Sequence, residues 1–374
     1  MLSLWEIKGR LGYLVNQKTE PWFGAHVSLR RAFPYLVVAK LPQACHFDCA
    51  QDRFLTVRID ITNRCNLRCK MCYFSMKEVQ AKPREEMPVT LFRKIAQDVL
   101  PAATQLIISA GAEPLYAKQF PAMLAIIAGY HVPHVAFFTN GTLLTPDLSA
   151  TILRTGVNVI TISFDGATPQ TYEAIRRGAK FDQVIRNIQV LQDLKKQAGS
   201  ATPALHFGVV LMKMNIAELP DILRLAHTLG IARVTASHVV PYAELGTKEE
   251  SLRRYPDLAD TYLARARQVA QEFALPFDAP PNFAEPRAAM PASCEWPWRE
   301  ILIRPDGSVH PCCYWYEDTS MGNFAAQAFQ EIWQGPAYAQ LRRELTAKAY
   351  RPGCAHCPAL NPEHGEVKIV NDKT

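Results

Sequence analysis

The stretch Phe54–Tyr73, FLTVRIDITNRCNLRCKMCY, decides the fold class. It opens with a run of apolar and β-branched residues, Phe54–Ile61, which predicts a buried strand. Three cysteines follow that strand directly, at positions 65, 69 and 72. Because functional loops of parallel α/β folds lie at the carboxyl ends of strands, we expect these thiols to lie at such an end.

Residues 53–240 continue as an alternation of strand-like and helix-like segments. Further strands are predicted where short runs are apolar or β-branched: Gln105–Ser109, His134–Phe138, Val157–Ser163, Leu205–Leu211 and Arg233–His238. Helical spacing, or Pro and Thr at the start, predicts helices between them: Thr90–Leu100, Ala117–Ala128, Pro146–Arg154, Pro169–Leu194 and Ala217–Leu229. Six strand–helix alternations predict an α/β fold with a parallel sheet and crossover helices.

Composition divides the chain into five regions. Residues 1–52 have no clear role and contain Cys45 and Cys49, and 53–240 form the α/β region. Residues 241–290 combine a helix, Pro256–Phe273, with a proline-rich connector. Residues 291–360 predict a cysteine-rich α+β domain, and 361–374 a polar tail. This domain is expected to contain a hairpin, Glu300–Ile303 with Val309–His310, and two helices, Ala325–Trp333 and Pro336–Ala347.

The overall composition is that of a soluble globular protein. Of the 374 residues 48% are apolar and 20% charged, and the net charge of +6 is too small to indicate nucleic-acid binding. No apolar run is long enough for a membrane span, and the first residues do not resemble a signal peptide. We therefore expect a cytoplasmic protein, in which the ten cysteines serve metal or cluster ligation rather than disulfides.

The cysteine loop has the spacing C-x3-C-x2-C. Three thiolates this close together can surround one corner of a [4Fe–4S] cluster, which normally takes four cysteines. One iron then stays open, so S-adenosylmethionine (SAM) would bind it through its amino and carboxylate groups and be cleaved to a 5′-deoxyadenosyl radical. The alternative is a structural zinc site, which requires a fourth ligand. The nearest downstream histidine is His131, and Cys45, His46 and Cys49 stand upstream.

At this point the sequence resembles the radical SAM superfamily over residues 53–240. The resemblance implies a partial (β/α)6 TIM-like barrel. Gly111–Pro114 resembles the family's Gly-Gly-Glu-Pro turn, which holds the SAM amino group, with Ala112 in place of one glycine. The resemblance implies cofactor-binding roles for Tyr73, Gly111, Ala112, Glu113, Thr139, Asn140, Ser163, Asp165, Arg176 and Val210.

The C-terminal cysteines resemble the SPASM/twitch auxiliary-cluster domain. The full SPASM pattern has further cysteines after its C-x2-C pair, whereas none follows Cys357 here. The resemblance therefore implies one auxiliary [4Fe–4S] cluster, held by Cys294, Cys312, Cys354 and Cys357. A zinc site with the same ligands is the alternative. Cys313 either replaces Cys312 as a ligand, packs as a small apolar residue, or returns a hydrogen atom to a substrate radical.

These features predict an enzyme that abstracts a hydrogen from a C–H bond of a small polar substrate, of the sugar or aminocyclitol type. The product would be oxidised or epimerised, with His238, Tyr242 or Glu244 as candidate acid–base groups. The alternatives are a SPASM-type peptide maturase or crosslinker, and a non-catalytic iron–sulfur electron carrier. A zinc-containing RNA-binding protein is disfavoured by the low charge. The expected reductant is flavodoxin or ferredoxin, with no nucleic-acid or membrane partner.

Overall fold

The structure is a computed structural model that describes residues 53–109, 111–285, 294–315, 319–355, 357 and 360. The predictions for Cys45 and Cys49, for most of the connector beyond residue 285 and for the tail lie outside these residues. Six parallel strands follow one another in the sheet: β1 (Leu55–Ile59), β2 (Ala103–Ile108), β3 (His134–Thr139), β4 (Val159–Ser163), β5 (Ala204–Leu211) and β6 (Arg233–His238). The predicted α/β class and parallel sheet are confirmed.

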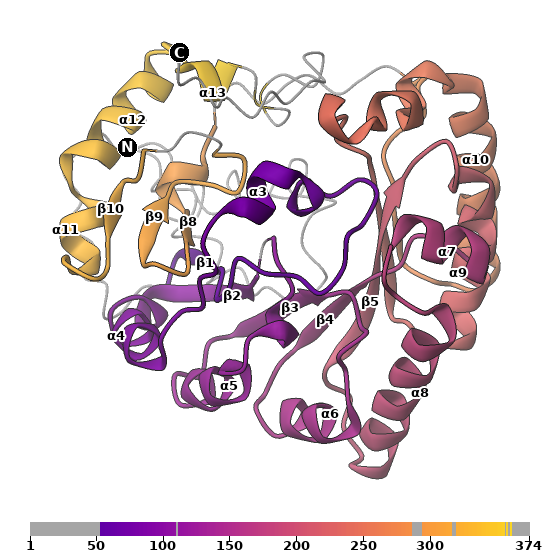
Figure 1. The fold of residues 1–374 in the computed structure, drawn as a ribbon, viewed down its shortest axis with the longest axis horizontal. Coiled ribbons are helices and arrows are strands. Elements are labelled where there is room, and N and C mark those ends of the chain that lie inside the picture. Colours follow the sequence, from indigo (N-terminus) through magenta and orange to yellow (C-terminus); the bar gives the residue numbers. More distant parts are fainter. Residues whose placement is uncertain are drawn as a thin grey trace, which may run out of the picture. The chain divides into compact units, whose positions relative to one another are not determined.

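Helices cover the outer face of this curved sheet (Figure 1). Between the strands lie α4 (Val89–Val99), α5 (Phe120–Ala128), α6 (Pro146–Leu153), α7 (Pro169–Ile175), α8 (Phe181–Gln197) and α9 (Leu219–Thr228), while α10 (Pro256–Glu272) follows β6. The spacing of three and four residues in α4 buries Phe92, Ile95, Ala96 and Val99 on one face. Burying a large apolar side chain of this kind contributes about 1.5–3 kcal/mol.

The opposite face of the strands points into the barrel. In β1 the buried residues Leu55, Val57 and Ile59 alternate with the half-buried Thr56 and Arg58. Strand geometry sends neighbouring side chains to opposite faces of the sheet. The half-buried set therefore lines the interior, where a substrate can be reached from the carboxyl ends of the strands.

The sheet continues beyond the barrel into the C-terminal region. Its order is β10-β9-β8-β1-β2-β3-β4-β5-β6-β7, in which β8 pairs with β1 in parallel and β9 pairs with β8 in antiparallel register. The additional strands are β7 (Phe277–Asp278), β8 (Glu300–Ile303), β9 (Ser308–His310) and β10 (Gly322–Asn323). The predicted hairpin is thus present, and its first strand extends the barrel sheet at β1 (Figure 1).

The helix predicted as Pro169–Leu194 is instead two helices. The chain leaves the helical conformation at Arg176, and Gly178 has φ +97° between α7 and α8. A positive φ interrupts a right-handed helix, and glycine adopts it without steric cost. The break between α7 and α8 places Arg176 next to the cysteine loop. This difference from the predicted single helix is therefore part of the candidate site.

Short helices complete the C-terminal region and the loop after the cysteines. They are α3 (Lys77–Ala81), α11 (Phe329–Trp333), α12 (Pro336–Thr346) and α13 (Pro352–Ala355). The helix expected at Ala325–Trp333 begins only at Phe329. Among the described residues, no helix has the length and apolar character required to span a membrane.

Candidate functional site

The segments predicted to bind SAM meet at the carboxyl ends of β1 to β4. The backbone N–H of Glu113 donates to the carbonyl of Arg64, 3.1 Å away, which joins the turn after β2 to the cysteine loop. From the end of β3, the Asn140 side-chain amide lies 3.8 Å from the sulfur of Cys65. The Arg176 guanidinium, beyond α7, lies 3.7 Å from the sulfur of Cys69. Three separate segments thus contact the cysteine loop.

The three thiols of the cysteine loop fit an iron–sulfur cluster. Burial raises the pKa of Cys65 to about 11 and that of Cys72 to about 12, and it also raises the pKa of Cys69. Each thiol is close enough to influence the ionisation of another. Bound iron would replace the thiol protons, and soft thiolates are the ligands that such clusters prefer. N–H groups of Leu67, Asn140 and Arg176 point at the sulfurs, as expected around a cluster.

Glu113 fixes the turn after β2 to the end of β3. Its buried carboxylate accepts hydrogen bonds from the Thr139 hydroxyl and the Asn140 backbone N–H, each at 2.7 Å, and from the Leu115 N–H at 3.2 Å. Burial raises the pKa of Glu113 to about 7, while these donors lower it. The side chain therefore positions the two loops relative to each other.

The contacts of the Gly111–Pro114 turn explain which glycine of the Gly-Gly-Glu-Pro pattern can be replaced. A Cβ at Gly111 would lie 2.8 Å from the ring of Phe74 and 3.0 Å from the Tyr73 hydroxyl. The chain has alanine at the next position, and Ala112 is accommodated as a buried residue whose carbonyl accepts from the Ser109 hydroxyl at 2.7 Å. Steric contact with the Tyr73–Ser75 turn thus requires glycine at 111 and permits alanine at 112.

A buried ion pair lies on the other side of the cysteine loop. Asp165, fully buried after β4, accepts hydrogen bonds from Arg176 Nε and from the Val210 N–H, the latter at 2.7 Å. Asn215 donates to the backbone carbonyls of Asp165 and Val210, both at 2.9 Å. The neighbouring ring of Phe164 stacks on Phe207 with centroids 4.4 Å apart, which holds this turn in place. Arg176 thereby reaches Cys69 with its charge balanced.

Two further residues predicted to bind SAM, Ser163 and Tyr73, make fewer contacts. Ser163 is half-buried at the end of β4, next to Gly208 of β5 in the sheet register. Tyr73 begins a short turn after Cys72, and its ring lies 4.3 Å from that of Phe74. Both residues lie at the same end of the sheet as the cysteines.

The C-terminal cysteines gather beside β8. Burial raises the pKa of Cys312 well above its usual value, and the nearby thiols of Cys313, Cys357 and Cys294 raise it further. Burial raises the pKa of Cys313 to about 11, and the nearby groups that act on it are Arg58, Glu300 and Cys357. Both Cys312 and Cys313 therefore lie near other tail thiols. Cys313 also lies near an ion pair between strands, in which Arg58 Nε lies 2.9 Å from Glu300 Oε1.

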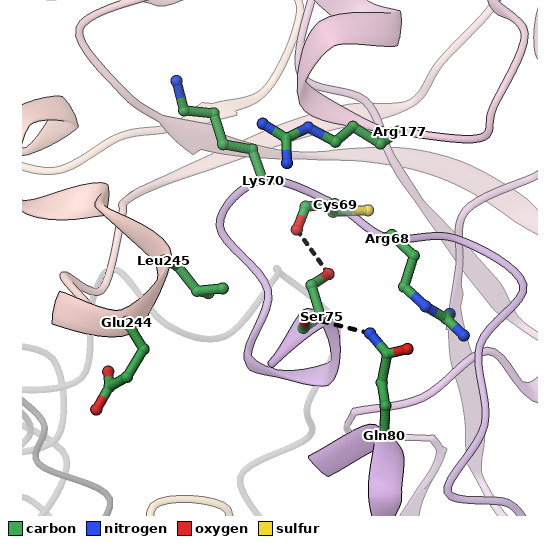
Figure 2. Close-up of a pocket in the computed structure, with 8 residues that line it drawn as sticks. All are labelled: Arg68, Cys69, Lys70, Ser75, Gln80, Arg177, Glu244 and Leu245. Carbon is green, nitrogen blue, oxygen red and sulfur yellow. Dashed lines mark hydrogen bonds between the residues drawn. The ribbon is translucent and has the colours of Figure 1, made fainter. Parts of the chain in front are cut away.

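The three candidate acid–base residues have different surroundings. His238 ends β6, with its ring 5.1 Å from that of Phe283, and Tyr242 is buried with its N–H bound to the Thr247 hydroxyl. Glu244 lines a cavity of about 320 Å³ next to Cys69. Figure 2 shows this cavity, with Glu244 on the short 3-10 helix Ala243–Leu245.

Sequence reasoning missed several residues that shape the site. Asn66 links the loops, accepting from the Asn140 amide at 2.9 Å and donating to the Thr142 hydroxyl at 2.8 Å. Its place inside the C-x3-C spacing was the available signal. Asn215 and the pair of Arg58 with Glu300 had no such signal, because their partners are distant in the sequence.

Comparison with known proteins assigns this site to a family. The radical SAM superfamily model matches residues 59–226, and the SPASM model, an iron–sulfur cluster-binding domain, matches residues 294–358. The chain is therefore a radical SAM enzyme with a C-terminal SPASM domain, as its motifs predicted. SAM, the [4Fe–4S] cluster that binds it and auxiliary iron–sulfur binding follow from this assignment.

Similar proteins differ in their substrates. The Fe-coproporphyrin III synthase of Methanosarcina barkeri is 26% identical over 351 residues, covering 86% of this chain and 84% of that protein. The mycofactocin maturase MftC of Mycobacterium tuberculosis is 25% identical over 320 residues, covering 83% and 77%. Streptococcus suis SuiB, solved with its precursor peptide SuiA, has a TM-score of 0.64 at 13% identity, covering 97% and 84%. This last likeness shows the shared fold.

Proposed function

We propose that Cys65, Cys69 and Cys72 hold the SAM-binding cluster, and that Cys294, Cys312, Cys354 and Cys357 hold the auxiliary one. The first assignment is supported by the N–H groups around the loop thiols. The second is supported by the position of Cys312 near the thiols of Cys294 and Cys357. A structural zinc at either place would give zinc instead of iron in anaerobically purified protein.

With both groups bound, the first cluster and SAM supply the 5′-deoxyadenosyl radical, which abstracts a hydrogen atom from the substrate. The chain's own residues position SAM. In this proposal the turn Gly111–Glu113 binds its amino group, and Asp165 holds Arg176 and the Val210 backbone at the cluster side. The contacts to SAM are assigned to Tyr73, Gly111, Ala112, Glu113, Thr139, Asn140, Ser163, Asp165, Arg176 and Val210.

We propose a peptide as the substrate. Phe137 packs its ring against Phe120 of α5, so its neighbour Phe138 points into the barrel, where 42% of it is exposed. An exposed aromatic ring in the barrel interior offers an apolar surface on which a side chain of a peptide can pack. MftC is a maturase, and SuiB has the same fold and was solved with a precursor peptide. These relatives favour the peptide alternative over the sugar or aminocyclitol substrate that the trimmed tail suggested.

Deuterium transfer tests the substrate class. The reconstituted enzyme is incubated with unlabelled SAM and with an extract of cells of the source organism grown in D2O, which contains deuterated substrate. Deuterium in 5′-deoxyadenosine is then measured by mass spectrometry. We expect transfer that disappears when the extract is first treated with a protease. Transfer that survives the protease in the small-molecule fraction would contradict the peptide. Transfer from the tetrapyrrole fraction would instead match the relatives that synthesise haem and Fe-coproporphyrin III.

The structure also bears on the fate of the substrate radical. Cys313 lies near Arg58, whose side chain lies on the barrel-facing side of β1. We propose that the Cys313 S–H bond breaks to give its hydrogen atom to the substrate carbon radical, so that the product is an epimer, and that one electron from the external reductant and one proton restore the thiol from the thiyl radical. Product formed in D2O would then carry one C–D bond, and Cys313→Ala would stop turnover after hydrogen abstraction. A product lighter by two hydrogens would contradict this and indicate oxidation.

A further inference from the structure

The cavity in Figure 2 lies against the cysteine loop. It is lined by Arg68, Cys69, Lys70, Ser75, Gln80, Arg177, Glu244 and Leu245. None of the residues proposed to contact SAM is among them. The sulfur of Cys69 faces Arg176, which is buried, whereas the exposed residues Arg68 and Arg177 border the cavity. Cys69, one of the proposed cluster ligands, itself lines this cavity.

The cavity rim is strongly cationic. Arg68, Lys70 and Arg177 surround Cys69, and Glu244 is the single carboxylate among the lining residues (Figure 2). Lys70 is paired with Glu250 at 2.7 Å, but the Arg68 guanidinium donates to the backbone carbonyls of Cys65 and Leu67, which leaves its charge uncompensated. Neither Arg68 nor Arg177 has a carboxylate within 4.0 Å among the residues that the structure describes. The rim therefore carries two exposed, unneutralised positive charges.

The rim is also held rigidly on the cluster loop. The backbone N–H groups of Arg68 and Lys70 donate to the carbonyls of Arg177 and Ile175, at 2.9 and 2.8 Å. From the other side, the Ser75 hydroxyl donates to the carbonyl of Cys69 at 2.8 Å. A surface that is already ordered loses little conformational freedom when a partner binds. These bonds fix the backbone that carries Arg68 and Arg177 relative to Cys69.

We propose that this cationic cavity, defined by Arg68, Lys70 and Arg177, is the docking surface for an acidic one-electron carrier protein that reduces the SAM-binding cluster. The inference rests on the proposed function, because a cluster that cleaves SAM must receive one electron from outside for each cleavage. One electron leaves the carrier, which is oxidised, and enters the cluster, which is reduced, with no bond made or broken. Opposite charges steer such a partner and accelerate its association. The substrate, in contrast, must reach the barrel side of the loop.

Arg177→Glu tests the docking surface, because the structure shows no hydrogen bond that this side chain makes to the cluster loop. Bleaching of the cluster absorbance by reduced flavodoxin is followed by stopped flow in the reconstituted holoenzyme at low ionic strength. We expect the second-order rate constant to fall about tenfold or more, as removal of electrostatic steering does, and the difference to vanish at high salt. Arg186→Glu on α8, an equal change of charge at an exposed position that does not line the cavity, should keep the wild-type rate.

Reduced methyl viologen, a small cationic reductant, separates docking from damage to the cluster. It should reduce the Arg177→Glu and wild-type clusters without loss of rate, and their midpoint potentials should agree. The proposal is overturned if flavodoxin reduces Arg177→Glu at the wild-type rate, if Arg186→Glu is slowed equally, or if methyl viologen reduction is slowed as much as flavodoxin reduction. SAM cleavage driven by methyl viologen in wild type tests the proposed function separately: its absence would refute that function, whatever the flavodoxin rates.

Discussion

The two groups of cysteines in this protein are held in place by different interactions. Side chains from other loops surround the cysteine loop: Asn140 and Arg176 reach its sulfurs, and buried carboxylates hold both of them. The tail cysteines are brought to the barrel by main-chain pairing of β8 with β1 and by two ion pairs, Arg58 with Glu300 and Asp60 with Arg304. A side-chain network can adjust the properties of a reactive centre residue by residue. A strand ladder mainly sets the position of the second centre.

The largest difference between the regions is expected in SAM cleavage. Cys72→Ala should abolish formation of 5′-deoxyadenosine, because the loop then lacks one of three cluster ligands. Cys357→Ala should retain cleavage and lose about one cluster of iron, since only the auxiliary site is opened. Iron analysis and 5′-deoxyadenosine quantification check both, with Cys313→Ala as the control that keeps the wild-type iron content. Cleavage retained by Cys72→Ala would show that the two regions have been assigned the wrong way round.

The ion pairs of Asp165 and Glu300 should differ in their contribution to stability. Asp165→Ala leaves Arg176 charged, buried and without its counter-ion, which typically costs about 3–5 kcal/mol. Glu300→Ala leaves Arg58, whose side chain is 21% exposed and can be hydrated, so about 1–2 kcal/mol is expected. Urea unfolding of the two variants measures these free energies. Equal losses of unfolding free energy in the two variants would mean that side-chain contacts hold the paired strands β8 and β1 as strongly as they hold the cysteine loop.

The smallest effect concerns the potential of the first cluster. Arg176→Lys keeps the positive charge beside Asp165 but loses the guanidinium N–H that points at Cys69. Loss of a donor to a cluster sulfur disfavours the reduced state, so the midpoint potential should fall by about 60 mV, the one-electron equivalent of ~1.4 kcal/mol. Electron paramagnetic resonance redox titration resolves both clusters. The auxiliary potential should stay constant, and Arg58→Lys, near Cys313, should move neither one.

Much of the barrel could be predicted because its signals are local. Each of the six strands was located to within a few residues, since apolar runs and turn residues mark them along the chain. The break at Gly178 was missed because both α7 and α8 have helical spacing. What interrupts them is the contact between Arg176 and Asp165, which spacing does not reveal.

The relation between the two regions could not be predicted, because it depends on long-range contacts. Arg58 and Glu300 are 242 residues apart, and nothing near either residue indicates that β8 extends the sheet at β1. For the same reason, the sequence left Cys312 and Cys313 equivalent as ligands. Both lie near Cys357, but Cys312 also lies near Cys294 and Cys313 near the ion pair, and this difference favours Cys312.

The account depends most directly on one iron of the first cluster having no protein ligand. Electron–nuclear double resonance of the reduced holoenzyme, with SAM carrying ¹⁵N at its amino group, measures whether that nitrogen binds the cluster. A ¹⁵N coupling in wild type that persists in Cys357→Ala is the predicted result. An intact, reduced first cluster without any ¹⁵N coupling would contradict the account.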